Sequence, residues 1–225
     1  MDLFESHFSL LQGDLNLYEK DGKFEMFGDG IPRHVNYSSF KAAFEELTKI
    51  KEPIIIETGS SYAGTKSTNL FDSYIRKYGG RFFSVDINAS VISKLRGEVS
   101  PGTTLVCDDS VEFLSEFSEN YPGLYPNFVY LDSYDIDWYN PEPSERHGYN
   151  EYIALKPLLK SCFLLIDDTP SSPYWIDSRG ELYDYLVKSG SMPGKGRLIV
   201  EEVDSNPSFQ KIHQYYQAFY KITHA

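Results

Sequence analysis

"PIIIETGSSYAGTKST", residues 53–68, joins three consecutive isoleucines to a glutamate and then to a glycine-containing turn. The short apolar run predicts a buried strand, and the polar segment after Gly64 predicts the start of a helix. The turn has no side chain at Gly59 or Gly64, so a ligand can approach its backbone closely. Junctions of this kind are where α/β proteins receive ligands.

The rest of the chain repeats this alternation of apolar runs and amphipathic segments. Strands are predicted at 53–57, 81–86, 103–107, 127–132, 162–168 and 196–203, and helices at 67–80, 88–97, 109–120, 148–159 and 178–190. Such alternation predicts an α/β fold with a mainly parallel, doubly wound sheet. The aromatic-rich run 209–222 fits either a helix or a strand, and we expect a final strand antiparallel to its neighbour.

Residues 1–50 are predicted to be an extension that precedes one folded unit, 51–225. Asp21-Gly22, within an alternating segment, predicts a hairpin, and the apolar face of 38–50 predicts a helix leading into the first core strand. Residues 133–148 are polar and proline-rich, which predicts a long irregular loop. Loops of that length in compact domains are often functional.

Composition limits the classes of partner. The 225 residues carry a net charge of −12, which repels the phosphates of nucleic acids and anionic membranes. The sequence has neither an apolar run of membrane-spanning length nor a basic amino-terminal segment, so a cytoplasmic, soluble protein is expected. Cys107 and Cys162 lie in apolar runs, which predicts buried free thiols. Association into a homo-oligomer stays open.

Acidic residues follow five successive predicted strands: Glu57, Asp86, Asp108 with Asp109, Asp132, and Asp167 with Asp168. At the end of the second strand, Asp86 can accept both hydroxyls of a ribose. Asp109 or Ser110 can then bind the exocyclic amine of a base. Both a dinucleotide and S-adenosylmethionine fit this outline. The negative charge of Glu57 disfavours a pyrophosphate and suits a cationic amino-acid or sulfonium group, which favours S-adenosylmethionine.

"IIIETGSSYAGTKS", "FFSVDI" and "LVCDDSVEFL" resemble the first three motifs of the class I S-adenosylmethionine-dependent methyltransferases, and the resemblance extends from about residue 36 to the end. It implies a Rossmann-like sheet of seven strands with the last strand antiparallel. The cofactor-binding residues predicted on these motifs are Glu57, Gly59, Ser61, Gly64, Ser67, Asp86, Asp109 and Ser110, and Asp132 at the end of the fourth strand is predicted to join them.

"VYLDSYD" and "LLIDDTP" resemble the fourth and fifth strand ends of the metal-dependent O-methyltransferases of the catechol and sugar or macrolide types. The resemblance implies that Asp132, Asp167 and Asp168 bind Mg²⁺. Carboxylates that converge this closely need a cation, and Mg²⁺ keeps positions for substrate oxygens. A hydroxyl bound there would become a stronger nucleophile.

The sequence departs from the catechol-type pattern at two places. The Gly59–Gly64 spacing is one residue longer, and Asp135 stands where those enzymes carry a lysine base. For the proton of the acceptor we therefore consider His147 first, because histidine titrates near neutrality, and Asp135 second.

These features predict an S-adenosylmethionine-dependent, Mg²⁺-dependent O-methyltransferase that acts on a hydroxyl of a small molecule such as a sugar, a polyol or a phenolic metabolite. Two alternatives stay open: an NAD-dependent oxidoreductase and a non-catalytic nucleoside-binding module.

Overall fold

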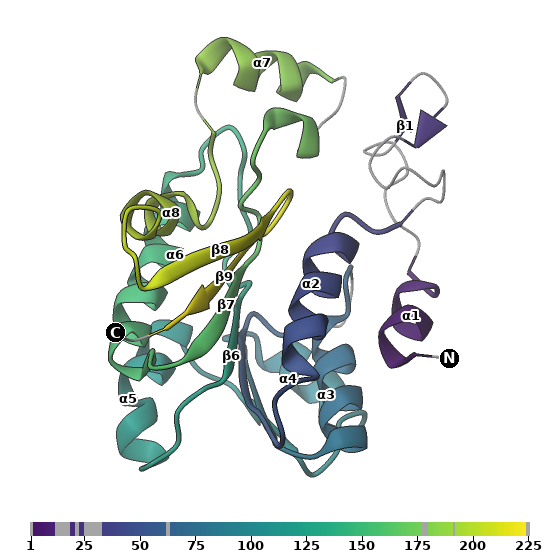
Figure 1. Cartoon of the computed structure of the whole chain (residues 1–225), viewed down its shortest axis with the longest axis vertical. Helices are drawn as coiled ribbons and strands as arrows, with labels where there is room; N and C mark the ends of the chain where they lie inside the picture. Colours follow the sequence, from purple (N-terminus) through teal and green to yellow (C-terminus); the bar gives the residue numbers. More distant parts are fainter. Residues whose placement is uncertain are drawn as a thin grey trace.

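A computed structural model describes residues 2–11, 19–20, 23–24, 33–61, 64–176, 180–190 and 192–223. Its centre is a seven-stranded sheet in the order β5-β4-β3-β6-β7-β9-β8 (Figure 1). The strands are β3 (Ile54–Thr58), β4 (Arg81–Val85), β5 (Thr103–Val106), β6 (Phe128–Leu131), β7 (Cys162–Ile166), β8 (Phe209–Gln214) and β9 (Ala218–Ile222). Neighbours from β5 to β7 pair in parallel, whereas β9 is antiparallel to β7 and β8. The predicted sheet is confirmed.

Helices cover both faces of the sheet (Figure 1). Successive strand residues face opposite sides, as the pleat requires. Ile55 and Phe128 pack with α1 (Leu3–Phe8), α2 (Tyr37–Leu47) and α3 (Ser67–Tyr78). Ile56 and Val129 pack with α5 (Ser110–Asn120), α6 (Glu142–Leu155) and α8 (Arg197–Val203). The described part of the chain also contains α4 (Ala89–Leu95), α7 (Glu181–Ser189) and the 3₁₀ turns η2 (Lys156–Leu158) and η3 (Pro173–Trp175).

The strand order creates a switch point between β3 and β6. The chain moves outward from β3 through β4 to β5, and then returns to the other side of β3 to form β6. Ligands of open α/β sheets bind at the carboxyl ends of the strands beside such a point. The quoted stretch lies there, because β3 runs directly into it.

The segment 196–203, predicted to be a strand, is instead helix α8. Its β-branched residues suggested a strand, but Ile199 and Val203 are buried four residues apart and Glu201 is exposed, which is the pattern of an amphipathic helix. The sixth strand therefore lies further along the chain. Residues 209–222 contain both β8 and β9, not one strand.

Three further expectations meet the structure in different ways. The predicted loop 133–148 is irregular only in its first half, because α6 begins at Glu142. Cys162 is buried as predicted, whereas Cys107 is exposed. Strands β1 (Glu19–Lys20) and β2 (Lys23–Phe24) pair as the predicted hairpin, although its turn, Asp21-Gly22, lies outside the described residues.

Among the residues described, we find no helix with the length and apolar character to cross a membrane.

Candidate functional site

A cavity of about 630 Å³ opens at the carboxyl ends of the parallel strands. This volume is in the range of small-molecule sites. Of the predicted site residues, eight line it: Gly59, Ser61, Asp86, Asp109, Ser110, Asp132, Asp135 and His147. Segments that follow four different strands thus meet around one space, as the acidic strand ends predicted. Glu57, Gly64 and Ser67 are not among the lining residues.

The turn after β3 brings two strand ends into close contact. Gly59 has φ +80°, and a Cβ atom placed on it would lie 2.3 Å from the carbonyl oxygen of Asp132. Glycine is therefore required there by both conformation and space. Gly64, at φ +55°, has open space around it, so only its conformation favours glycine. Tyr62 and Ala63, between them, lie outside the described residues.

Glu57 does not line the cavity, and it is linked to the turn after β3 through hydrogen bonds of Thr68. Its Oε2 accepts hydrogen bonds from Thr68 Oγ1 at 2.6 Å and Ser84 Oγ at 2.7 Å. Thr68 Oγ1 in turn accepts the backbone N–H of Ser61 at 2.8 Å. Burial raises the pKa of Glu57 to about 7, although the hydroxyl donors oppose this shift. The structure thus gives Glu57 a supporting place, not a position on the cavity wall.

Asp86 and Asp109 line the cavity at the ends of β4 and β5. Asp86 accepts backbone N–H groups with both oxygens, Ser60 at 3.0 Å and Asn88 at 2.7 Å, which fixes its carboxylate at the wall. Asp109 is the N-cap of α5 and accepts the N–H of Val111 at 2.8 Å. Asp109 therefore combines a helix-capping role with exposure to the cavity, whereas Asp86 lines the cavity without capping a helix.

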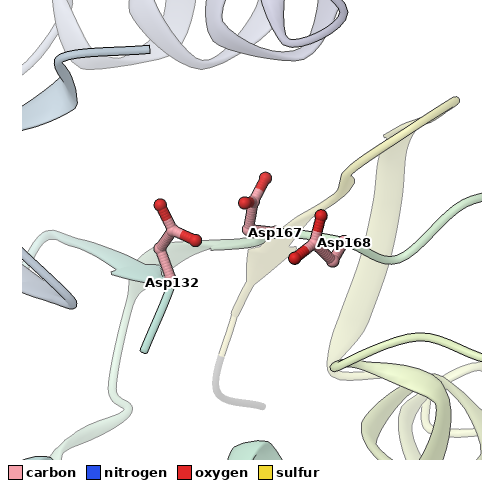
Figure 2. Close-up of side chains that lie close together, drawn as sticks. All are labelled: Asp132, Asp167 and Asp168. Carbon is pink, nitrogen blue, oxygen red and sulfur yellow. The ribbon is translucent and has the colours of Figure 1, made fainter. Parts of the chain in front are cut away.

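The ends of β6 and β7 bring three carboxylates together beside this cavity (Figure 2). Asp132, Asp167 and Asp168 each offer an oxygen atom, and these atoms lie within 4.8 Å of one another. We call these three residues the carboxylate cluster. Their side chains are 11–18% exposed, so water screens their repulsion weakly. Asp168 also has a left-handed backbone, φ +42°, a strained conformation that tends to occur at functional sites.

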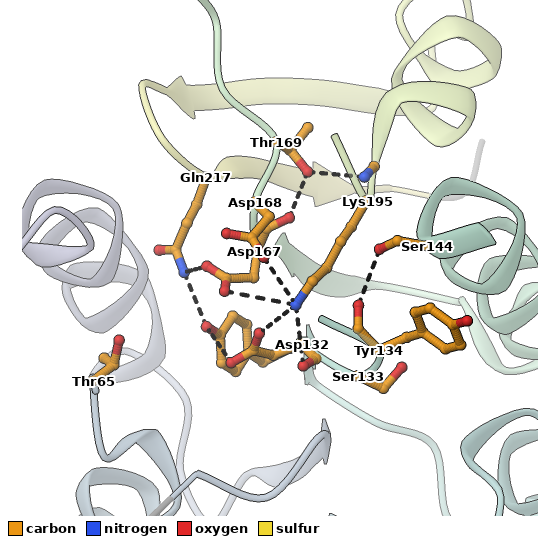
Figure 3. A network of polar contacts seen from close by, with 12 residues as sticks. Thr65, Asp132, Ser133, Tyr134, Ser144, Asp167, Asp168, Thr169, Lys195 and Gln217 are labelled. Atoms are coloured by element: carbon orange, nitrogen blue, oxygen red, sulfur yellow. Dashed lines mark hydrogen bonds and ion pairs between the residues drawn. The ribbon is translucent and has the colours of Figure 1, made fainter. Parts of the chain in front are cut away.

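Lys195, on the loop before α8, places its ammonium group in the carboxylate cluster (Figure 3). Its Nζ lies 2.9 Å from Asp132 Oδ1, 3.1 Å from Asp168 Oδ2 and 4.0 Å from Asp167 Oδ2. Burial opposes a charge on this side chain, but the three carboxylates together raise the pKa of Lys195 well above its ordinary value. The cluster therefore contains a cation supplied by the chain itself.

Neutral side chains bind the remaining carboxylate oxygens. Tyr130 donates to Asp132 Oδ2 at 3.0 Å, and Tyr216 donates to Asp168 Oδ1 at 2.5 Å. Gln217 Nε2 donates to Asp167 Oδ1. Tyr216 and Gln217 come from the turn between β8 and β9, so that hairpin reaches into the site.

Comparison with solved structures identifies the fold. The calicheamicin methyltransferase CalS11 superposes with a TM-score of 0.52 at 14% identity, covering 82% of this chain and 77% of that one. Its apo form, described as a TDP-rhamnose 3'-O-methyltransferase, gives 0.52 at 15% identity with the same coverage. An O-methyltransferase from Bacillus cereus in complex with SAH gives 0.51 at 12% identity, covering 83% and 81%. The chain has the class I methyltransferase fold. No protein-family model matches the sequence, and no curated protein does.

Within this methyltransferase fold, the carboxylate cluster is the predicted Mg²⁺ site. Its oxygen atoms are a donor set that Mg²⁺ prefers, and the predicted convergence of the three residues is confirmed. An ion bound by all three would, however, compete with the Lys195 ammonium, which lies within 4.0 Å of an oxygen of each carboxylate. The residues as arranged therefore do not fit Mg²⁺, and Mg²⁺ dependence stays a prediction that this lysine opposes.

His147 and Asp135, predicted to act on the acceptor proton, both line the cavity. His147 projects from helix α6, not from a loop as expected, and its Nε2 lies 3.1 Å from Ser110 Oγ. Hydrogen bonding to Glu151 raises the pKa of His147 above its ordinary value. The ring of Tyr134 packs on the imidazole, with centroids 5.3 Å apart. Asp135 is exposed at the mouth.

Sequence reasoning missed several residues of the site. Lys195 is the most consequential of them, and its only signal is its place between two glycines in "PGKGR". Ile87, Asn88 and Val91 also line the cavity after β4. Gln217 was missed because residues 209–222 were predicted to form one strand, whereas it lies in the turn between β8 and β9.

Proposed function

We propose that this protein is an S-adenosylmethionine-dependent methyltransferase acting on a hydroxyl of a small molecule such as a sugar, a polyol or a phenolic metabolite. The observation that carries the proposal is the cavity, where the turn at Gly59, the carboxylate of Asp86 and the capping pair Asp109 and Ser110 meet. The fold shared with known O-methyltransferases supports methyl transfer.

Each wall of the cavity suits one part of the cofactor. Asp86, held by two backbone N–H groups, has the position for a ribose diol. Asp109 and Ser110 can bind an adenine amine. The backbone of Gly59–Ser61 lines the part of the cavity proposed for the amino-acid end, with its N–H groups bonded to Val85, Asp86 and Thr68. Asp132 lies on the same wall, paired with Lys195. When bound, S-adenosylmethionine supplies an electrophilic methyl group.

The acceptor side is rich in aromatic residues beside the carboxylate cluster. Tyr134 lines the cavity, and Trp138 packs against Tyr216 with ring centroids 6.4 Å apart. Trp175 stacks on Tyr215 at 4.6 Å. Aromatic faces combined with carboxylates suit a ligand that has both apolar surface and hydroxyl groups. We keep His147 as the first candidate to take the acceptor proton, although its Nε2 lies 3.1 Å from Ser110 Oγ, at the end of the cavity proposed for adenine.

The experiment that tests this proposal is a calorimetric titration with S-adenosylhomocysteine, repeated with NADH. We expect micromolar binding of the first ligand and none of the second. Asp86→Asn should weaken binding about tenfold or more, because an amide cannot accept both ribose hydroxyls and both N–H groups. Asp108→Asn is the matched control, since Asp108 does not line the cavity. Preferential NADH binding would favour an oxidoreductase.

A further inference from the structure

Lys195 occupies the place that a metal ion would need. An ion bound to the carboxylate cluster must contact one oxygen of each residue at about 2.0–2.1 Å. The Lys195 Nζ lies within 4.0 Å of an oxygen of all three residues. Two cations cannot share that space without strong repulsion. The cluster therefore takes the ammonium or a metal, but not both.

The ammonium makes two hydrogen bonds and an ion pair inside the site. It donates to Asp132 Oδ1 at 2.9 Å and to the carbonyl oxygen of Asp132 at 3.3 Å, and it contacts Asp168 Oδ2 at 3.1 Å. A lysine has three N–H donors, and these three contacts match them in number. Only 4% of the side chain is exposed. This is the environment of a fixed internal ion pair, unlike that of a lysine that reaches the site from solvent.

The backbone on both sides of Lys195 packs closely against Asp168 and Thr169, which brings the lysine side chain to the carboxylate cluster. A Cβ atom on Gly194 would lie 2.6 Å from the carbonyl oxygen of Asp168, and one on Gly196 would lie 2.5 Å from Thr169 Oγ1. The N–H of Lys195 donates to the Asp168 carbonyl at 2.9 Å. Glycine on both sides of the lysine thus lets its loop lie directly against the end of β7.

Helix α6 holds the same loop from the opposite side. Glu145 accepts two hydrogen bonds from Arg197, at 2.9 Å and 2.7 Å, and accepts the N–H of Gly194 at 3.3 Å. A Cβ on Gly148 would lie 2.7 Å from the carbonyl oxygen of Lys195, so the helix touches the loop backbone. Movement of this loop away from the site would break these contacts.

We propose that Lys195 is the built-in cation of the carboxylate cluster, and that the cluster acts without a divalent metal. Lys195 is then a positioning residue: it holds the carboxylate of Asp132 in one orientation at the cavity wall and balances the charge of its neighbours. The catalytic meaning of this inference rests on the proposed function, but cation binding can be measured without cofactor or acceptor.

The first experiment uses the unaltered protein. Mn²⁺ is titrated into the 225-residue chain and followed by electron paramagnetic resonance, and thermal unfolding is recorded with Mg²⁺ and with EDTA. We expect no saturable Mn²⁺ binding at micromolar concentration and identical melting temperatures in the two buffers. Saturation at one Mn²⁺ per chain would overturn the proposal.

The second experiment removes the ammonium in Lys195→Met, which keeps the apolar part of the side chain. Three buried carboxylates without a cation should lower the melting temperature by about 10 °C. Mn²⁺ or Mg²⁺ should then bind and restore much of the loss, an effect that a lysine with only a packing role would not produce. Lys156→Met is the control, because that lysine pairs with Glu202 outside the cluster. It should gain no metal binding.

The two experiments keep the inference separate from the proposed function. A Lys195→Met protein that folds but gains no Mn²⁺ binding would overturn the inference. If the variant does not fold, the Mn²⁺ titration of the unaltered protein decides alone. Failure of S-adenosylhomocysteine to bind would instead remove the proposed function and leave the cation result standing.

Discussion

Glu57 carries a fully buried carboxylate at the end of β3 and binds the hydroxyl groups of Thr68 and Ser84. The sequence predicts that Glu57 lies at the end of the first core strand, and its negative charge suggested that it contacts the cofactor. The structure puts two hydroxyl side chains and the Ser61 backbone between this carboxylate and the cavity. A sequence shows which residue ends a strand, but not how deep that residue lies.

The burial of Glu57 predicts a pH dependence of stability. Its folded-state pKa of about 7 lies above the ordinary value of 4.5. The folded chain therefore holds the proton more tightly, and the free energy of unfolding should fall as the pH rises from about 4.5 to above 7, by about 3 kcal/mol from this group. Glu57→Gln should remove that fall. Urea denaturation across this pH range would check it, with the exposed Glu119→Gln as control; parallel curves for Glu57→Gln and the wild type would contradict the assignment.

At the scale of elements, the turn after β3 could be predicted and helix α8 could not. An apolar run followed by an acid and glycines has few structural solutions, so the strand, turn and helix at 53–80 were correct. Residues 196–203 mix β-branched and acidic side chains, and only packing against α6 decides that Ile199 and Val203 share a helical face. Lys195 was missed for a related reason. No local pattern indicates that a loop lysine will lie beside acids that precede it by 27 residues or more in the chain, and the structure alone shows that contact.

The turn after β3 provides a matched pair of glycines for a test. Gly59→Ala should lower the free energy of unfolding by about 3 kcal/mol or more, since it adds a clash with the Asp132 carbonyl to an unfavourable φ. Gly64→Ala should lower the free energy of unfolding by only about 1 kcal/mol, because nothing lies within 4 Å of the Cβ atom that it adds. Chemical denaturation of both variants gives the comparison. Equal losses would mean that the close approach of β3 and β6 contributes little.

At the scale of the whole molecule, the net charge of −12 and the acids at the cavity wall act on any charged ligand. S-adenosylmethionine carries one more positive charge than S-adenosylhomocysteine, at its sulfonium. Raising the ionic strength from low to physiological values should therefore weaken the binding of S-adenosylmethionine roughly twofold to threefold more than the binding of S-adenosylhomocysteine. Calorimetric titrations of both ligands at two salt concentrations would measure this difference. Equal salt dependence would show that the cavity field does not reach the sulfonium.

The hairpin of β8 and β9 places a condition on how the protein is made. Tyr216 and Gln217 follow their carboxylate partners by 48 and 50 residues. At the usual speed of translation, a ribosome needs roughly 2–10 s to add that length. During this interval Asp167 and Asp168 have been synthesised without the side chains that satisfy them, and the edge of β7 lacks the strand that covers it. The nascent chain thus passes through a stage in which a bare sheet edge is open to pairing with other chains, so binding by a chaperone would be most useful at that stage.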